Sequence, residues 1–512
     1  MLAKVFTSVL IGIDAHAVEV EVDIANGLPT FSIVGLPETA VRESKERVRS
    51  AIRNAGFRFP DDRITVNLAP AHIKKEGTGF DLPIALGILG ANGTIAQKDL
   101  DTLMFLGELS LDGRIKPVFG ALCVALAARR AGFKGIFVPD ANCQEASVVK
   151  DLSIYAALEL SQVVEFLRGN LVLESRKSDP AGEDPEGGLL WAEDFSEVKG
   201  QQHAKRALEI AAAGGHNLLM IGPPGSGKTM LAKRLPSVMP PLTFEEALEA
   251  TKIHSVAGCL TPGQGLIRRR SFRSPHHTIS DAGLIGGGAV PRPGEVSMAH
   301  HGVLFLDELP EYKRHVLEVL RQPLEDKKVT IARASSSLTY PANFMLLAAM
   351  NPCPCGYYSD PQHHCRCTEQ QINRYRARIS GPLLDRFDLQ IEVPAVPHEQ
   401  LLNAPAGIAS RVIRERVVAA RAIQSERFRR TRIHCNAQMR VRHIEVFCRL
   451  DAGCTQLLRG AMLKLGLSAR GANRLIKIGR TIADLEGKAR ISENHVAEAV
   501  QYRSMDRYHC AP

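Results

Sequence analysis

The sequence predicts an α/β protein whose central domain is a parallel sheet flanked by helices. Three observations lead to this prediction. The stretch Asn217–Ile221 is a short apolar run, followed by a glycine-rich loop and then by a helical pattern from Met230. Two further apolar runs, Val303–Leu306 and Phe344–Met350, also end in polar residues, as strands buried in a parallel sheet do. Strand and helix patterns alternate through this whole block, which is typical of parallel-sheet domains.

The 512 residues are enough for about three domains. The first part of the chain alternates strand-like and helix-like patterns, which predicts an α+β domain. Examples are the half-buried strand Val18–Ile24 and the helix Val41–Ala55, which stops before Gly56. A polar, acidic segment rich in Pro and Gly follows and is typical of a linker. The predicted division is a first domain at 1–170, a linker at 171–192, the parallel-sheet core at 193–395 and a helical domain at 396–512.

The composition is that of a soluble globular protein, with 45% hydrophobic and 23% charged residues. The net charge of +9 permits a polyanionic partner. No apolar run approaches the roughly 18 residues needed to cross a bilayer. The apolar run near the N-terminus is short, contains Gly12 and continues into a strand, so we interpret it as part of the fold and not as a signal peptide. We therefore expect a cytoplasmic protein that does not enter a membrane.

The strongest motif is GPPGSGKT, which matches the phosphate-binding pattern G-x-x-x-x-G-K-[ST] between a strand and a helix. Its glycines let backbone N–H groups converge on phosphate oxygens at a helix N-terminus. Lys228 would reach the β- and γ-phosphates, and Thr229 would hold Mg²⁺. The predicted nucleotide-binding residues are Gly222, Pro223, Pro224, Gly225, Ser226, Gly227, Lys228 and Thr229.

Three polar residues follow the other two apolar runs and extend this site. Asp307 and Glu308 come directly after Val303–Leu306, and Asn351 follows the run that ends at Met350. The carboxyl ends of parallel strands meet at the phosphate-binding edge. Asp307 can therefore order the Mg²⁺ shell and Glu308 can polarise an attacking water. Asn351 can hydrogen-bond both water and γ-phosphate without adding charge. Solvated acids at a strand end are the alternative interpretation of the two carboxylates.

Five segments together carry a family resemblance: GPPGSGKT, LFLDEL, AAMNPCPCGY, GPLLDRFD and SARGANRLIK. The chain resembles the magnesium-chelatase-like branch of AAA+ ATPases, in particular the ComM/YifB family of competence-associated proteins. The resemblance implies ATP and Mg²⁺, a phosphate-loop core and a helical C-terminal lid. It also implies an arginine finger acting on a neighbouring subunit at Arg386, and a sensor 2 arginine at Arg470, with Arg474 in reserve. Such a finger requires head-to-tail packing and hence a homo-oligomeric ring, which the family makes hexameric. Without the resemblance, each of these arginines would be interpreted as a surface residue.

The first domain resembles the proteolytic domain of Lon, a ribosomal protein S5 domain 2-like fold. The segments that carry this likeness are KKEGTGFDLPIAL and LGELSLDGRIKPVFGALCVALAARRAG. Gly79 stands at the position of the Lon nucleophile and Leu122 at the position of its lysine base. Neither side chain can act as a nucleophile or base, so we expect no peptidase activity.

Four cysteines form two Cys-x-Cys pairs, Cys353 with Cys355 and Cys365 with Cys367. Zinc, reduced structural thiols and a redox switch are all open. Structural zinc sites usually have two to four residues between paired ligands, so this spacing is tight. His363 and His364 are possible substitutes for one of the sulfurs. We favour Zn²⁺, because a tetrahedral clip would hold this loop in shape.

DNA, single-stranded or branched, is the partner that the family resemblance and the charge favour. Arg269 and Arg273 lie in the basic segment IRRRSFRSPHH, and Arg333 lies in the predicted strand-turn-strand VTIARASSSLTYPANF. In related helicases a pore hairpin lies there with a DNA-contacting basic residue. Alternatively, Arg333 pairs with an acid such as Asp326 and only steadies the hairpin. The family implies branch migration in natural transformation and homologous recombination, with recombination proteins as possible partners. The alternative function is a metal-chelatase motor subunit or another protein-remodelling AAA+ ATPase.

Overall fold

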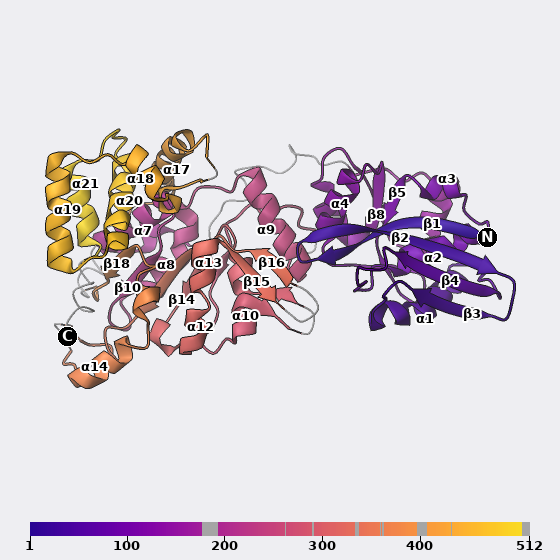
Figure 1. Cartoon of the computed structure of the whole chain (residues 1–512), viewed down its shortest axis with the longest axis horizontal. Helices are drawn as coiled ribbons and strands as arrows, with labels where there is room; N and C mark the ends of the chain where they lie inside the picture. Colours follow the sequence, from indigo (N-terminus) through magenta and orange to yellow (C-terminus); the bar gives the residue numbers. More distant parts are fainter. Residues whose placement is uncertain are drawn as a thin grey trace. The chain divides into compact units, whose positions relative to one another are not determined.

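The structure is a computed structural model that describes residues 1–176, 193–261, 263–288, 291–332, 337–358, 360, 363–396, 407–431 and 433–503. The chain divides into two units, which are described one at a time (Figure 1). The first unit consists of residues 1–186, 244–267 and 332–340, and the second of residues 187–243, 268–331 and 341–512. Most of the predicted linker, residues 177–192, lies outside the described residues.

A mixed seven-stranded sheet forms the centre of the first unit. Buried side chains alternate with more exposed ones along its strands. Val18, Val20 and Val22 are fully buried, which confirms the strand predicted at Val18–Ile24. The two long strands β1 and β2 pair antiparallel, whereas β5, β8 and β9 run parallel. In sheet order the strands are β3 (Thr30–Val34), β4 (Arg63–Ala69), β2 (Asp14–Ala25), β1 (Leu2–Ile11), β5 (Leu103–Phe105), β8 (Gly135–Pro139) and β9 (Ser153–Ala157). The short strands β6 (Glu108–Leu109) and β7 (Ile115–Lys116) pair with each other outside this sheet.

The helices of the first unit bury their apolar residues against this sheet. Val41, Val48 and Ile52 of α1 are buried at helical spacing, and the helix ends shortly before Gly56, whose φ is +84°. Both features confirm the predicted helix and its glycine stop. The helices are α1 (Thr39–Asn54), α2 (Asp81–Ala91), α3 (Gln97–Leu100), α4 (Ala121–Arg130), α5 (Cys143–Ser147) and α6 (Leu160–Leu167).

One further helix of the first unit, α9 (Phe244–Ala257), comes from the middle of the predicted core segment. It packs on α4. The Ser255 hydroxyl donates to a Glu145 carboxylate oxygen at 2.5 Å, and Lys252 pairs with Asp14 at 3.0 Å. The first unit is therefore assembled from segments far apart in the sequence, because residues 244–267 and 332–340 belong to it together with residues 1–186.

The second unit contains a five-stranded, all-parallel sheet. Its strands are short and almost wholly buried, because helices cover both faces and separate apolar clusters fill the two sides. In sheet order the strands are β11 (Phe272–Arg273), β14 (Val303–Leu306), β17 (Met345–Met350), β10 (Leu218–Ile221) and β18 (Leu389–Glu392). The helices around it are α7 (Gln202–Gly214), α8 (Lys228–Val238), α10 (Asp281–Ile285), α11 (Glu295–Met298), α12 (Arg314–Glu318), α13 (Arg321–Asp326), α14 (Glu369–Arg376) and α15 (Gly381–Leu384).

Two small strand pairs lie outside the two main sheets: β12 (Gly286–Gly287) pairs with β13 (Arg292–Pro293), and β15 (Lys328–Ala332) pairs with β16 (Ser337–Pro341). The second pair is the predicted strand-turn-strand between β14 and β17. Its turn, residues 333–336, lies outside the described residues, and so does Arg333.

The C-terminal part of the second unit is helical, as predicted, and is drawn in orange to yellow in Figure 1. A buried ion-pair network organises it: Asp484, whose side chain is fully buried, accepts hydrogen bonds from Arg427, Arg480 and Asn436. Among the described residues, no helix combines the length and apolarity needed to cross a membrane. The helices are α17 (Ser410–Arg427), α18 (Val441–Phe447), α19 (Ala452–Leu465), α20 (Ala469–Leu485) and α21 (Glu493–Gln501).

Candidate nucleotide site and cysteine cluster

The glycine-rich loop lies at the carboxyl edge of the parallel sheet, between β10 and α8. Helix α8 begins at Lys228, two residues before the predicted start, and Gly227 caps it with a φ of +85°. At Gly222 a Cβ would lie 2.1 Å from the Val393 carbonyl oxygen, so this backbone approach requires glycine. Gln201 further supports the loop by donating from its side-chain amide to the Ser226 carbonyl oxygen at 2.6 Å. The predicted strand-loop-helix arrangement is confirmed.

Lys228 is folded back into the loop. Its Nζ donates to the carbonyl oxygens of Gly222 and Pro223, both at 2.8 Å, and lies 3.3 Å from Asn351 Oδ1. Burial lowers the pKa of the Lys228 ammonium, and the Asp307 carboxylate offsets part of this effect. The ammonium is thus held at the loop by uncharged oxygens, which a phosphate can replace at little cost.

Thr229 and Asp307 meet directly at the same edge. The Thr229 hydroxyl donates to Asp307 Oδ2 at 2.6 Å, and Asp307 Oδ1 accepts from the backbone N–H of Glu308 at 2.9 Å. A hydroxyl and a carboxylate are the oxygen donors that Mg²⁺ prefers. The predicted pair of magnesium ligands is therefore brought together by the fold.

Glu308 lies next to this pair in an unusual backbone conformation, with a φ of +50°. Its carboxylate Oε2 is 3.4 Å from Nδ1 of His277, whose ring makes an edge contact with Tyr312. The Tyr312 hydroxyl in turn donates to the Pro275 carbonyl oxygen. His277 was not predicted as a site residue. The sequence signal was present in the FRSPHH segment, but we assigned that segment to DNA.

Asn351 directly follows β17 and completes the group around Lys228. The backbone N–H of Gly222 donates to the Met350 carbonyl oxygen at 3.2 Å, which fixes this strand end against the loop. The structure therefore brings Lys228, Thr229, Asp307, Glu308 and Asn351 to one edge of the sheet, as predicted.

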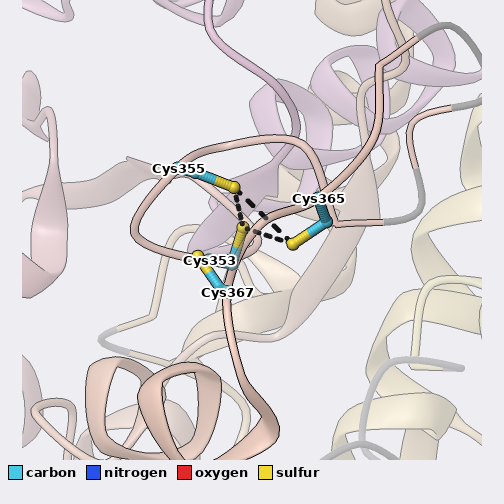
Figure 2. Close-up of side chains that lie close together, drawn as sticks. All are labelled: Cys353, Cys355, Cys365 and Cys367. Atoms are coloured by element: carbon cyan, nitrogen blue, oxygen red, sulfur yellow. Dashed lines mark hydrogen bonds between the residues drawn. The ribbon is translucent and has the colours of Figure 1, made fainter.

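The loop that follows Asn351 carries the four cysteines, and Figure 2 shows their sulfurs converging. The Sγ atom of Cys353 lies 3.3 Å from that of Cys355 and 3.7 Å from that of Cys365, and Cys355 and Cys365 are 3.6 Å apart. With Cys367 they form a group whose ligand atoms all lie within 4.8 Å of one another. All four thiols are free. His363 and His364 do not belong to this group, and His363 instead pairs with Asp360 at 3.5 Å.

Arg386 and Arg474 lie at the other edge of the sheet. The Arg386 carbonyl oxygen accepts from the Asn217 side chain, and its guanidinium pairs with Glu325 of α13. Arg474 of α20 lies 3.4 Å from Asp388 Oδ1. Asn217 and Asp388 directly precede β10 and β18, which run parallel, so they mark the amino edge.

Both arginines are therefore separated from the phosphate loop of their own chain by the length of the strands. Within one chain Arg474 is not a ligand of that loop. Burial alone would raise the pKa of Asp388, but His216 and the charges of Arg474 and Lys477 hold it well below its usual range. Arg470 is exposed near the start of α20.

The residues predicted to contact DNA differ in their surroundings. Arg273 makes a two-pronged ion pair with Glu295, at 2.5 and 2.6 Å, which gives it a structural partner. Arg269 is exposed. The neighbouring Arg270 donates to three backbone carbonyl oxygens, those of Pro240, Pro241 and His301. Only part of this basic segment therefore faces solvent.

In the first unit, neither Lon-like position carries reactive chemistry. A Cβ at Gly79 would lie 2.9 Å from Leu106 Cδ1, and Leu122 is fully buried in the core. Of the nearby lysines, Lys75 is buried and donates to the Pro70 carbonyl oxygen, while Lys74 pairs with Glu38. The Ser110 hydroxyl donates to Asp112 at 2.6 Å. These contacts offer no nucleophile–base pair at the two positions.

Comparison with known proteins agrees with this geometry. The family model described as magnesium chelatase, subunit ChlI matches residues 194–401, and its C-terminal counterpart matches residues 407–503. A third, described as subunit ChlI of Mg-chelatase, matches residues 20–142. Competence protein ComM of Haemophilus influenzae is 46% identical over 511 residues, which cover 99% of this chain and 98% of that protein. The chain belongs to the ComM/YifB family. YifB of Escherichia coli K12 is 45% identical over 507 residues, again covering 99% and 98% of the two chains.

Membership of this magnesium-chelatase-like AAA+ family implies ATPase activity. The 38 kDa subunit of magnesium chelatase from Rhodobacter capsulatus is more distant, 24% identical over 328 residues that cover 59% of this chain and 84% of that one.

Proposed function

We propose that this ComM/YifB-family protein is an ATP-driven ring motor that acts on DNA. The observation that carries the proposal is the distribution of charged side chains over the two edges of the parallel sheet. The phosphate loop, its carboxylates and Asn351 lie at the carboxyl edge, and the arginines Arg386 and Arg474 lie at the amino edge.

ATP is held by the loop at residues 222–229. The backbone N–H groups and Lys228 bind the phosphates, and Thr229 and Asp307 would hold Mg²⁺. Bound Mg²⁺ supplies positive charge that stabilises the β- and γ-phosphates. Glu308 polarises the attacking water, and Asn351 hydrogen-bonds the water or the γ-phosphate.

The position of the arginines supports a ring. Because Arg386 and Arg474 lie at the edge opposite the loop of their own chain, they can complete a site on a neighbour packed head to tail. Repeated head-to-tail packing closes into a ring when the rotation allows it. The resemblance to AAA+ ATPases makes six subunits the expected number, with Arg386 as the finger and Arg470 or Arg474 as the sensor.

DNA is the substrate that the charge and the family favour. The net charge is +9, and Arg269 is exposed. In the sequence, the β15–β16 hairpin lies between β14, which precedes Asp307, and β17, which precedes Asn351. The name of the Haemophilus relative, competence protein, supports a role in natural transformation. We propose branch migration of recombination intermediates in the cytoplasm, in contact with other recombination proteins.

The second candidate is a chelatase-type motor subunit, which the descriptions of the matching family models favour. ATP hydrolysis by the purified full chain should be measured without DNA, with single strands, with duplex and with a four-way junction. The Lys228→Ala variant serves as the control for contaminating ATPases. We expect stimulation by single-stranded or branched DNA and movement of the junction. Equal rates in all four conditions, with no movement of the junction, would reject the DNA motor.

A further inference from the structure

We propose that His277 is a positioning residue for Glu308, and that it keeps the Glu308 carboxylate on the side of the nucleotide site from which water attacks. The proposal rests on the proposed function, because it takes Glu308 as the residue that polarises this water. It gives the His277 end of the FRSPHH segment a part in ATP turnover instead of DNA binding.

The Glu308 carboxylate depends on a partner for its orientation. The backbone of this residue is fixed: its N–H donates to Asp307 Oδ1 at 2.9 Å, and its carbonyl oxygen accepts from the N–H of Glu311 at 2.8 Å. The side chain, in contrast, is 59% exposed, and in the described part of the chain its carboxylate pairs with one group, Nδ1 of His277 at 3.4 Å. A solvated side chain with several rotatable bonds occupies several rotamers unless a contact selects one. His277 supplies that contact.

The ring of His277 is itself held on two sides. It packs against the ring of His276, with the centroids 4.1 Å apart, and makes an edge contact with Tyr312. His276 Nδ1 lies 2.9 Å from the hydroxyl of Thr278. Tyr312 is 3% exposed, and its hydroxyl donates to the Pro275 carbonyl oxygen at 2.5 Å. An imidazole fixed in this way can hold a mobile carboxylate in one orientation.

The order of the strands gives this contact a direction. The strands β11, β14, β17 and β10 are successive neighbours in the sheet, so the phosphate loop after β10 and the segment after β11 lie on opposite sides of Glu308. In phosphoryl transfer the attacking water and the leaving group are roughly in line, on opposite sides of the γ-phosphate. The leaving group stays at the phosphate loop, so water approaches from the β11 side. His277 therefore holds the carboxylate on the side where it can polarise this water.

The proposal is tested by steady-state ATPase assays on the full chain without DNA. His277→Phe keeps a flat ring beside Tyr312 but lacks Nδ1. Because displacement of a catalytic group by about 1 Å can cost about 100-fold, we expect kcat to fall about 10- to 100-fold. The KM and the affinity for a fluorescent ATP analogue should remain those of the wild type. His277→Asn, which places an amide N–H near the position of Nδ1, should restore most of the rate. A ring that only supports the fold would give the opposite order, with the Phe variant active and the Asn variant impaired.

His315→Phe is the matched control, because His315 also lies beside a carboxylate, 3.3 Å from Asp281, but is 64% exposed and outside the site. Its kcat should be unchanged. Should His277→Phe not fold, His277→Ala replaces it, and equal rates in the Ala and Asn variants would overturn the proposal.

Glu308→Gln, assayed in parallel, separates the two levels of the argument. A normal kcat in His277→Phe beside an inactive Glu308→Gln would overturn the positioning role and leave the ATPase site standing. Normal turnover by Glu308→Gln would instead reject the role of Glu308 on which the proposal rests. No assay contains DNA, so the outcome does not depend on the DNA motor.

Discussion

Replacement of Asp484 should destabilise the second unit strongly. In the described part of the chain, its carboxylate is the only acidic group that the guanidinium groups of Arg427 and Arg480 contact. Its side chain is fully buried, and the side chains of Arg427 and Arg480 are 12% and 2% exposed. Asp484→Ala leaves two nearly buried cations without their counter-ion. Removal of one partner from a buried ion pair costs about 3–5 kcal/mol. In a unit of this size, each kcal/mol of lost unfolding free energy lowers the melting temperature by about 2 °C. We therefore expect the melting temperature to fall by roughly 6–10 °C.

Differential scanning calorimetry of the full chain measures this effect. The transition of the second unit should move and that of the first unit should stay, because the network lies within the second unit. Glu426→Gln is the control: its pair with Arg429 spans 3.7 Å between side chains that are more than three-quarters exposed, and such pairs contribute about 0–1 kcal/mol. An Asp484→Ala protein that melts like the wild type would refute the argument. Helix α20 carries both the network and Arg474, so we also expect the variant to lose ATP turnover.

Three further predictions follow from the site and the first domain. Lys228→Ala should abolish nucleotide binding, whereas Glu308→Gln should bind ATP and assemble but release no phosphate; normal phosphate release would remove Glu308 as the water-activating residue. The full chain should cleave no casein with or without ATP, because Gly79 and Leu122 stand at the two Lon positions, and ATP-dependent cleavage by highly purified protein would contradict this. Arg333→Ala should keep basal ATPase and ring assembly but lose DNA stimulation, and its residual DNA affinity should fall less steeply with salt. A variant that melts earlier yet still moves junctions would assign Arg333 a structural role.

The parts of the site predicted from the sequence are those encoded over short distances. The phosphate loop is contiguous, and Asp307, Glu308 and Asn351 each follow an apolar run directly. The rule that parallel strands end at the same edge was enough to bring them together. The cysteine cluster was predictable for the same reason, because one short loop contains all four residues.

Contacts between distant segments could not be predicted in this way. His277 reaches Glu308 because β11, only two residues long, pairs beside β14, and so short a strand leaves no periodic pattern. Helix α9 belongs to the first unit through partners such as Asp14, which is 238 residues away from Lys252. Arg474 was placed at the nucleotide by resemblance. The structure places it at the opposite edge, because its acidic partner precedes β18.

The two edges of the sheet also differ in which groups neutralise their cations, and in the proposed ring this difference would separate nucleotide binding from turnover. At the carboxyl edge, the hydrogen-bond partners of Lys228 among the described residues are all uncharged oxygens, so a phosphate can replace them without breaking an ion pair with these residues. At the amino edge, Arg386 is paired with Glu325 and Arg474 with Asp388. In the proposed ring, either arginine would have to exchange a carboxylate for phosphate before it could act on a neighbour. In the proposed ring, one chain would suffice to bind ATP, whereas an arginine-assisted reaction would require both a neighbouring subunit and the opening of an ion pair, so we expect hydrolysis to respond to how the subunits are packed.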